Sequence, residues 1–182
     1  LQHELVFTNI LSVLDLAGIP LRTNQRRRED PLILAGGPVA YNCEPIADFL
    51  DAVVLGDGED VFLEICDVFE AWKASDTPRK ELLCRLSKLE GVYIPSFYDM
   101  TYGSQAAEGW NMPPLQSIQP REGAPQTVRR RFVEDLNRVP FPEAPIVALG
   151  KTVHSRLGIE VQRGCTRACR FCQAGYIYRP ER

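Results

Sequence analysis

The stretch Asp51–Glu59, DAVVLGDGE, decides the fold because a short apolar run passes directly into a glycine loop. The stretch Pro31–Pro38, PLILAGGP, has the same pattern earlier in the chain. Apolar runs without polar alternation are typical of strands that are buried on both faces, as in parallel sheets. We therefore expect two parallel strands whose glycine loops lie at the same edge of one sheet. Ligands bind at that edge in open α/β folds.

Segments with helical spacing of apolar residues surround these two runs. The alternation of strands and helices predicts a doubly wound, flavodoxin-like α/β domain with a parallel sheet. The first residues are expected to be the tail of a preceding strand or its loop. The expected helices cover 10–17, 42–50, 59–72 and 78–89, and a further strand covers 91–95.

The periodicity is lost after residue 95, where prolines become frequent. We expect a proline-rich connector with a hairpin or two over 96–150, after the α/β domain of 1–95. Residues 157–161 again have the pattern of a strand, so 151–182 is expected to begin a second domain. Because the chain starts with Leu1 and stops soon after its last cysteine, we expect both domains to be truncated.

Composition excludes several classes of protein. The chain of 182 residues has 45% apolar and 25% charged residues, which is typical of globular proteins, and its net charge of -3 favours no nucleic-acid surface. The arginine runs 26–28 and 129–131 are expected to be solvated loop charge or charge at the edge of a strand. No apolar segment is long enough to span a membrane, so a cytoplasmic location is expected. In that compartment thiols stay reduced, and clustered cysteines are metal ligands or redox groups.

Three of the six cysteines lie in the stretch GCTRACRFCQAG, residues 164–175. Cys165, Cys169 and Cys172 can surround one cubic iron–sulfur cluster, with Gly164 allowing a tight turn before them. Three ligands leave one iron open to a substrate or cosubstrate, as in catalytic metal sites. The alternatives are a zinc site that recruits His154 or a remote residue, and an accidental clustering of structural thiols. The other three cysteines lack ligand spacing.

The spacing Cys165-x-x-x-Cys169-x-x-Cys172, with aromatic Phe171 before the last cysteine, resembles the signature of the radical S-adenosylmethionine (SAM) enzymes. The resemblance implies that these cysteines bind a 4Fe-4S cluster and that SAM chelates the open iron. One electron then cleaves SAM to give a 5'-deoxyadenosyl radical, which abstracts hydrogen from a substrate. Phe171 would lie against the adenine. Residues 160–180 are similar to a subgroup in which a (β/α) radical SAM barrel follows a cobalamin-binding-like domain.

The upstream glycines extend this resemblance. Gly36, Gly37, Gly56 and Gly58 resemble the two loops of the cobalamin-binding-like domain found before many radical SAM barrels. Cobalamin is therefore a candidate ligand of these loops. The Asp-x-His loop that supplies a cobalt ligand in some of these domains is absent from the sequence. A preceding segment could hold it, cobalamin could bind without it, or the domain could have lost cobalamin.

The expected fold is thus a partial doubly wound α/β domain followed by the first strand and cluster loop of a radical SAM barrel. The expected cofactors are a 4Fe-4S cluster and SAM, and the expected partners are an electron donor such as flavodoxin or ferredoxin and a substrate of unknown identity. The 182-residue chain alone is expected to be inactive, because one strand cannot enclose SAM. Two other classes remain open: a zinc-stabilised binding module and an iron–sulfur electron carrier.

Overall fold

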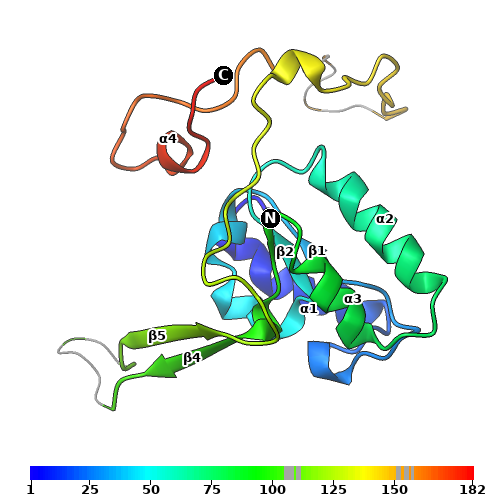
Figure 1. Cartoon of the computed structure of the whole chain (residues 1–182). Coiled ribbons are helices and arrows are strands. Elements are labelled where there is room, and N and C mark those ends of the chain that lie inside the picture. Colours follow the sequence, from blue (N-terminus) through cyan, green and yellow to red (C-terminus); the bar gives the residue numbers. More distant parts are fainter. Residues whose placement is uncertain (105–108, 110–111, 151–152, 154–155, 157) are drawn as a thin grey trace. The chain divides into compact units, whose positions relative to one another are not determined.

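The computed structural model describes residues 1–104, 109, 112–150, 153, 156 and 158–182 (Figure 1). The chain divides into two compact units, Leu1–Phe132 and Val133–Arg182. The first unit contains both glycine loops, and the second contains the cysteine loop. The boundary between the units falls inside the segment for which the sequence predicts a connector.

A three-stranded sheet forms the centre of the first unit. Its strands are β1 (Leu34–Ala35), β2 (Ala52–Val54) and β3 (Val92–Tyr93), in the order β1-β2-β3. Strands β1 and β2 are parallel, with Leu34 opposite Ala52 and Ala35 opposite Val53. The predicted pair of adjacent parallel strands is therefore confirmed, and both glycine loops follow the carboxyl ends of these strands.

Strand β3 departs from the expected parallel sheet because it runs antiparallel to β2. Two helices, α2 (Val61–Lys73) and α3 (Arg79–Leu86), stand between β2 and β3. The chain runs back along the sheet in α2 and forward again in α3, so it returns to the edge at which β2 ended. Strand β3 starts from that edge and therefore runs opposite to β2. The observed arrangement is a mixed α/β fold with a small sheet, and the flavodoxin-like topology is not seen among the described residues.

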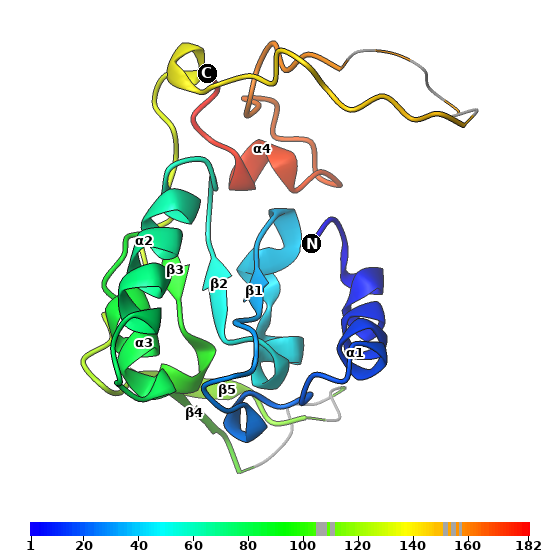
Figure 2. The same ribbon diagram turned by 90° about the vertical axis from the view of Figure 1, so that its right-hand side faces the viewer.

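Helices cover both faces of this sheet (Figure 2). On one face, α2 and α3 pack on β2 and β3 through Val61, Ile65, Trp72, Leu82 and Leu86. On the other face, α1 (Phe7–Leu16) and two 3-10 helices bury a second apolar cluster that includes Phe7, Val39, Ala40, Ile46 and Leu50. This double coverage explains why the strands lack polar alternation, since no residue of β2 is exposed.

The remaining helices of the first unit are short. The segment before α1 is a 3-10 helix (Glu4–Val6) and not a strand. The helix predicted over 42–50 is replaced by two 3-10 helices, Pro38–Asn42 and Glu44–Phe49, each of which has proline in its first turn. Two further 3-10 helices cover Thr23–Gln25 and Pro95–Phe97.

An antiparallel hairpin follows the sheet, as the sequence predicts. It consists of β4 (Tyr98–Tyr102) and β5 (Leu115–Pro120), which pair with each other. The second unit contains the 3-10 helix Leu136–Arg138 and the helix α4 (Ala174–Ile177).

The strand expected over 157–161 is not found. Leu157 lies outside the described residues, and 158–161 have no regular structure. A strand is stable only when a neighbour satisfies its backbone groups, and no described segment pairs with 158–161. The predicted start of a barrel therefore stays a prediction.

Within the described part of the chain, no helix has both the length and the apolar character needed to cross a membrane.

Candidate functional site

The three clustered cysteines lie on one loop that runs into α4. Cys165 and Cys172 are partly buried, whereas Cys169 is exposed, and all three are free thiols. Two local hydrogen bonds shape the loop: the amide of Cys172 donates to the Cys169 carbonyl (3.1 Å), and the amide of Cys169 donates to the Arg167 carbonyl (2.9 Å). The amide of Arg167 also donates to Sγ of Cys165 (3.4 Å). The loop thus bends tightly between its first and last cysteine.

The C-terminal residues fold back across the start of this loop. Gly164 has φ +89°, and a β-carbon there would lie 2.3 Å from the Tyr178 carbonyl oxygen and 2.7 Å from that of Pro180. Only glycine permits this close backbone crossing. Glu181 fixes the same crossing, because its carboxylate accepts hydrogen bonds from the amide (3.1 Å) and the hydroxyl (3.2 Å) of Thr166. The sequence identified Gly164 as a turn glycine, but it gave no signal for Thr166 and Glu181.

An ion pair supports the chain directly before the cysteine loop. Arg163 donates two hydrogen bonds of 2.8 Å to the two carboxylate oxygens of Glu160. These bonds lower the pKa of Glu160, the charges of Arg163 and Arg182 add to the effect, and desolvation opposes it. The backbones of Arg163 and Arg182 are also joined by two hydrogen bonds, of 2.8 and 2.9 Å. These contacts therefore hold residues 160–166 against residues 178–182. We call these two segments together the base of the cysteine loop.

The cysteine side chains meet the chemical requirement of an iron–sulfur cluster but are not gathered around a centre. Among the described residues, no three His, Cys, Asp or Glu side chains lie close enough together to hold a metal ion. Thiolates on one short loop are nonetheless the soft ligands that such clusters take. Phe171 is 91% exposed. His154, the alternative zinc ligand, lies outside the described residues. The donor set fits a cluster with one iron that lacks a protein ligand.

The first glycine loop is covered by the beginning of the chain. Gly37 has φ +97°, and a β-carbon there would lie 2.7 Å from the carbonyl oxygen and 2.9 Å from the nitrogen of Leu1. The backbone nitrogen of Leu1 donates a hydrogen bond of 2.5 Å to the carbonyl of Gly36. The space beside Gly37 is therefore occupied by this chain's own backbone, which gives Gly37 a structural role.

The second glycine loop is covered by Arg131. Gly56 has φ +111°, and its β-carbon would lie 1.8 Å from the Arg131 carbonyl oxygen. Arg131 donates its amide to Leu55 (2.8 Å) and accepts from the amide of Asp57 (2.9 Å), so it extends the sheet as a parallel bridge. Its guanidinium pairs with Glu64 of α2. The spaces beside Gly37 and Gly56 are therefore filled by this chain's own backbone, whereas the space beside Gly58 is open.

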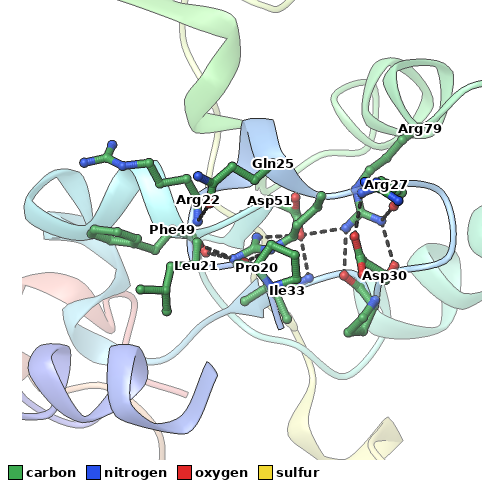
Figure 3. Close-up of polar contacts among 12 residues, drawn as sticks. Pro20, Leu21, Arg22, Gln25, Arg27, Asp30, Ile33, Phe49, Asp51 and Arg79 are labelled. Atoms are coloured by element: carbon green, nitrogen blue, oxygen red, sulfur yellow. Dashed lines mark hydrogen bonds and ion pairs between the residues drawn. The ribbon is translucent and has the colours of Figure 1, made fainter. Parts of the chain in front are cut away.

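A buried charged cluster lies at the opposite, amino end of the strands (Figure 3). Asp51 is only 1% exposed, and its Oδ2 accepts from Arg26 (3.0 Å), Arg79 (2.9 Å) and the amide of Ile33 (2.8 Å). Arg26 also donates to three backbone carbonyls, of Pro20, Leu21 and Phe49. Ligands bind at the carboxyl ends of parallel strands. This cluster therefore holds the loop that enters β1, and it is a structural site.

The expectation of solvated loop or strand-edge charge is wrong for Arg26 and Arg28, whereas Arg131 does lie at the edge of the sheet. Arg26 is buried, and Arg28 stacks over the Trp72 ring at 4.3 Å and donates to the Thr77 carbonyl. Arg131 is partly buried and bridges to Glu64. The consecutive arginines suggested a charged surface, but arginine can bury its stem and still satisfy its donors on backbone carbonyls.

The family of the chain is decided by its first half. A family model described as "Radical SAM proteins, N-terminal" matches residues 1–95, more than half of the chain. This chain belongs to the radical SAM proteins. The match covers the α/β sheet with its two glycine loops and ends before the cysteine loop. The radical SAM assignment from 1–95 is therefore independent of the cysteine spacing at 165–172.

One curated relative of this radical SAM chain is "Uncharacterized protein MJ0966" of Methanocaldococcus jannaschii. It is 25% identical over 185 residues, which cover 100% of this chain and 30% of the relative. The chain thus spans less than a third of the length of this relative. No solved structure matches the chain.

Proposed function

We propose that this chain is part of a radical SAM enzyme in which Cys165, Cys169 and Cys172 hold a 4Fe-4S cluster. The observation that carries the proposal is the agreement of two separate segments: the family match lies in 1–95, and the cysteine spacing lies in 165–172. An accidental trio of thiols would not be expected to follow a radical SAM N-terminal domain. The substrate of the whole protein is not specified by these residues.

When bound, the cluster would supply one electron for the reductive cleavage of SAM. This chain's own residues would prepare the site for that chemistry. The three thiolates would leave one iron without a protein ligand, open to the amino and carboxylate groups of SAM. Exposed Phe171 is available to stack against the adenine. The base formed by Gly164, Thr166 and Glu181 would hold the cysteine loop in one conformation.

The charge of the cysteine loop and the redox state of its thiols bear on two further parts of this proposal, the electron donor and the cellular location. The cysteine loop carries two cationic side chains, Arg167 and Arg170. Such groups attract an acidic electron donor such as a flavodoxin or ferredoxin. The proposal places the protein in the cytoplasm, where thiols stay reduced.

The decisive experiment uses the full-length protein, reconstituted anaerobically with iron and sulfide and reduced with dithionite. We expect SAM to be converted to 5'-deoxyadenosine, and we expect Cys169→Ala to abolish the conversion. Cys66→Ala is a suitable control because Cys66 lies on α2, outside the loop. If the parent protein forms no 5'-deoxyadenosine, or if Cys169→Ala forms as much as the parent, the proposal is wrong.

Cobalamin is the second ligand that we consider, because both glycine loops lie at one sheet edge and the space beside Gly58 is open. Valine at Gly37 would clash with Leu1 whether or not cobalamin binds, so that position cannot test the idea. Gly58 is the better position, since a β-carbon there meets nothing within 4 Å. We expect hydroxocobalamin to co-elute with the full-length protein and to be lost from Gly58→Val. No co-elution with the parent would remove the proposal.

A further inference from the structure

Strand β1 has one edge that is not paired by any described segment. The carbonyl of Ile33 accepts from the amides of Asp51 (3.0 Å) and Ala52 (3.3 Å), so Ile33 directs its backbone groups toward β2. Backbone groups alternate in direction along a strand. Leu32 and Leu34 therefore direct their amides and carbonyls away from β2, toward the outer edge. Such an edge readily pairs with a further strand.

Two apolar grooves flank this edge, one on each face of the sheet. The first, of about 510 Å³, lies against α2. Its lining is mainly apolar, with Phe62, Ile65 and Phe69, and it also includes charged residues of α2 and of 28–30. The second, of about 740 Å³, lies against α1 and is lined by Ile10, Val13 and Leu14. Leu32 and Leu34 line both grooves. We call these the α2 groove and the α1 groove.

Several apolar side chains that line the grooves are exposed to solvent. Phe62 of the α2 groove is 55% exposed, and Val13 of the α1 groove is 63% exposed. The edge residues Leu32, Ile33 and Leu34 include no charge and no proline, which are the usual devices that protect a free edge. Side chains of a strand alternate between the two faces of a sheet. One apolar strand at this edge would therefore fill both grooves at once.

The start of the chain lies where such a strand would end. The carbonyl of Leu1 accepts from the amide of Val39 (3.4 Å), and the backbone nitrogen of Leu1 donates to the carbonyl of Gly36, so Leu1 lies at the carboxyl end of β1. From there α1 runs back along the sheet, and residues 17–33 return the chain into β1 (Figure 2). A strand that ended at Leu1 would thus run parallel to β1, with α1 as the crossover helix of a β-α-β unit.

We propose that the residues directly preceding Leu1 in the longer polypeptide form a strand that pairs in parallel with β1. Its side chains are apolar on both faces and alternate between the α2 groove and the α1 groove. A segment of the same polypeptide is favoured over a second copy because its end is already held at Leu1 beside Gly36 and Gly37. This inference concerns the α/β unit alone and does not depend on the cluster or on SAM.

Photocrosslinking in the full-length protein tests the inference. Phe62 is replaced by the photoreactive residue benzoylphenylalanine, and the attached peptide is identified by mass spectrometry. We expect the photoreactive residue to attach to a peptide of the same polypeptide, within the roughly ten residues before Leu1. This span holds a strand of about five to six residues together with its flanking residues. The same substitution at Leu63, which is 65% exposed and lines neither groove, is the matched control and should not attach there. Attachment to another segment, attachment between two polypeptides, or no attachment from position 62 overturns the inference.

Hydrogen exchange of the unmodified full-length protein is the second measurement, since it requires no substitution. The amide of Ala35 faces β2, and the amide of Leu34 faces the outer edge. If the proposed strand is present, both amides are protected to within about tenfold, because both lie in a sheet ladder. If the Leu34 amide exchanges orders of magnitude faster than the Ala35 amide, the outer edge is free and the inference is wrong.

Discussion

At the scale of single residues, Asp51 is the centre of the most strongly buried polar cluster described in the first unit. It accepts from two arginines and one backbone amide while being almost fully buried. All three donors bond to Oδ2, whereas Oδ1 is buried without a hydrogen-bond partner among the described residues. The carboxylate therefore depends on these donors, and the two arginines in turn hold the loop before β1. A buried charge that loses its partner is costly, because nothing else can solvate it.

We therefore expect Asp51→Ala to lower the free energy of unfolding by about 3–5 kcal/mol, since it leaves Arg26 and Arg79 without their shared carboxylate. Urea titration of the full-length protein measures this change. Asp48→Ala is the matched control. Asp48 pairs with Arg22 on the surface, with side chains that are 69% and 53% exposed, so its loss should cost less than about 1 kcal/mol. Equal costs for the two variants would contradict the structural role of Asp51.

Cys43 gives a prediction for alkaline pH. Burial, together with the nearby charge of Glu44, raises the pKa of the Cys43 thiol to about 12 from its usual value of 9.0. The same carboxylate accepts a hydrogen bond of 2.6 Å from the hydroxyl of Tyr93, whose pKa is raised mainly by desolvation. The folded protein therefore favours the protonated form of both groups.

Because the folded pKa of Cys43 lies above the unfolded one, its contribution to stability is complete below about pH 9 and is lost as the pH rises toward 12. We expect the free energy of unfolding to fall between pH 9 and 12. Cys43→Ala should make this fall smaller, whereas Cys84→Ala, on α3, should leave it unchanged. An unaltered pH profile in Cys43→Ala would show that the thiol does not titrate in this way.

At the scale of elements, the cysteine loop depends on the chain segment that crosses behind it. The loop has little regular structure of its own, so its shape is set by the contacts of residues 160–166 with 178–182. Gly164 allows the crossing, and the Thr166–Glu181 hydrogen bonds fix it. A strained crossing would change the positions of all three cysteines together.

We expect Gly164→Ala to reduce the iron bound after anaerobic reconstitution at least severalfold, because the new methyl group would lie 2.3 Å from the Tyr178 carbonyl oxygen. Iron and sulfide analysis of the full-length protein measures the loss. Gly158→Ala is the control, since a β-carbon at Gly158 meets nothing within 4 Å. Full iron content in Gly164→Ala would mean that the crossing does not shape the cluster loop.

At the scale of the whole molecule, the sequence predicted the elements that depend on local patterns. The runs before Gly36 and Gly56 gave adjacent parallel strands, and the spacing of Ile65 and Phe69 gave α2. It did not predict the antiparallel β3, because strand direction depends on how the two intervening helices pack. It also missed Arg131 and Leu1 beside the glycine loops, since contacts between distant segments leave no local pattern.

The candidate site likewise has one part that local sequence patterns predict and another part that they do not. The spacing of the cysteines predicts a cluster site, and the match in 1–95 supports the radical SAM family from a separate segment. The supporting residues Thr166 and Glu181 could not be found from sequence, because their role comes from the fold of the C-terminal segment.

The central claim is that the three cysteines hold a cluster whose open iron binds SAM. Electron spin resonance of the reduced, reconstituted full-length protein, recorded with and without SAM, tests it most directly. We predict a 4Fe-4S signal that changes when SAM is added, that is absent from Cys169→Ala, and that is retained in Cys66→Ala. A signal that SAM leaves unchanged would indicate an electron carrier, and native zinc or an undiminished signal in Cys169→Ala would contradict the cluster itself.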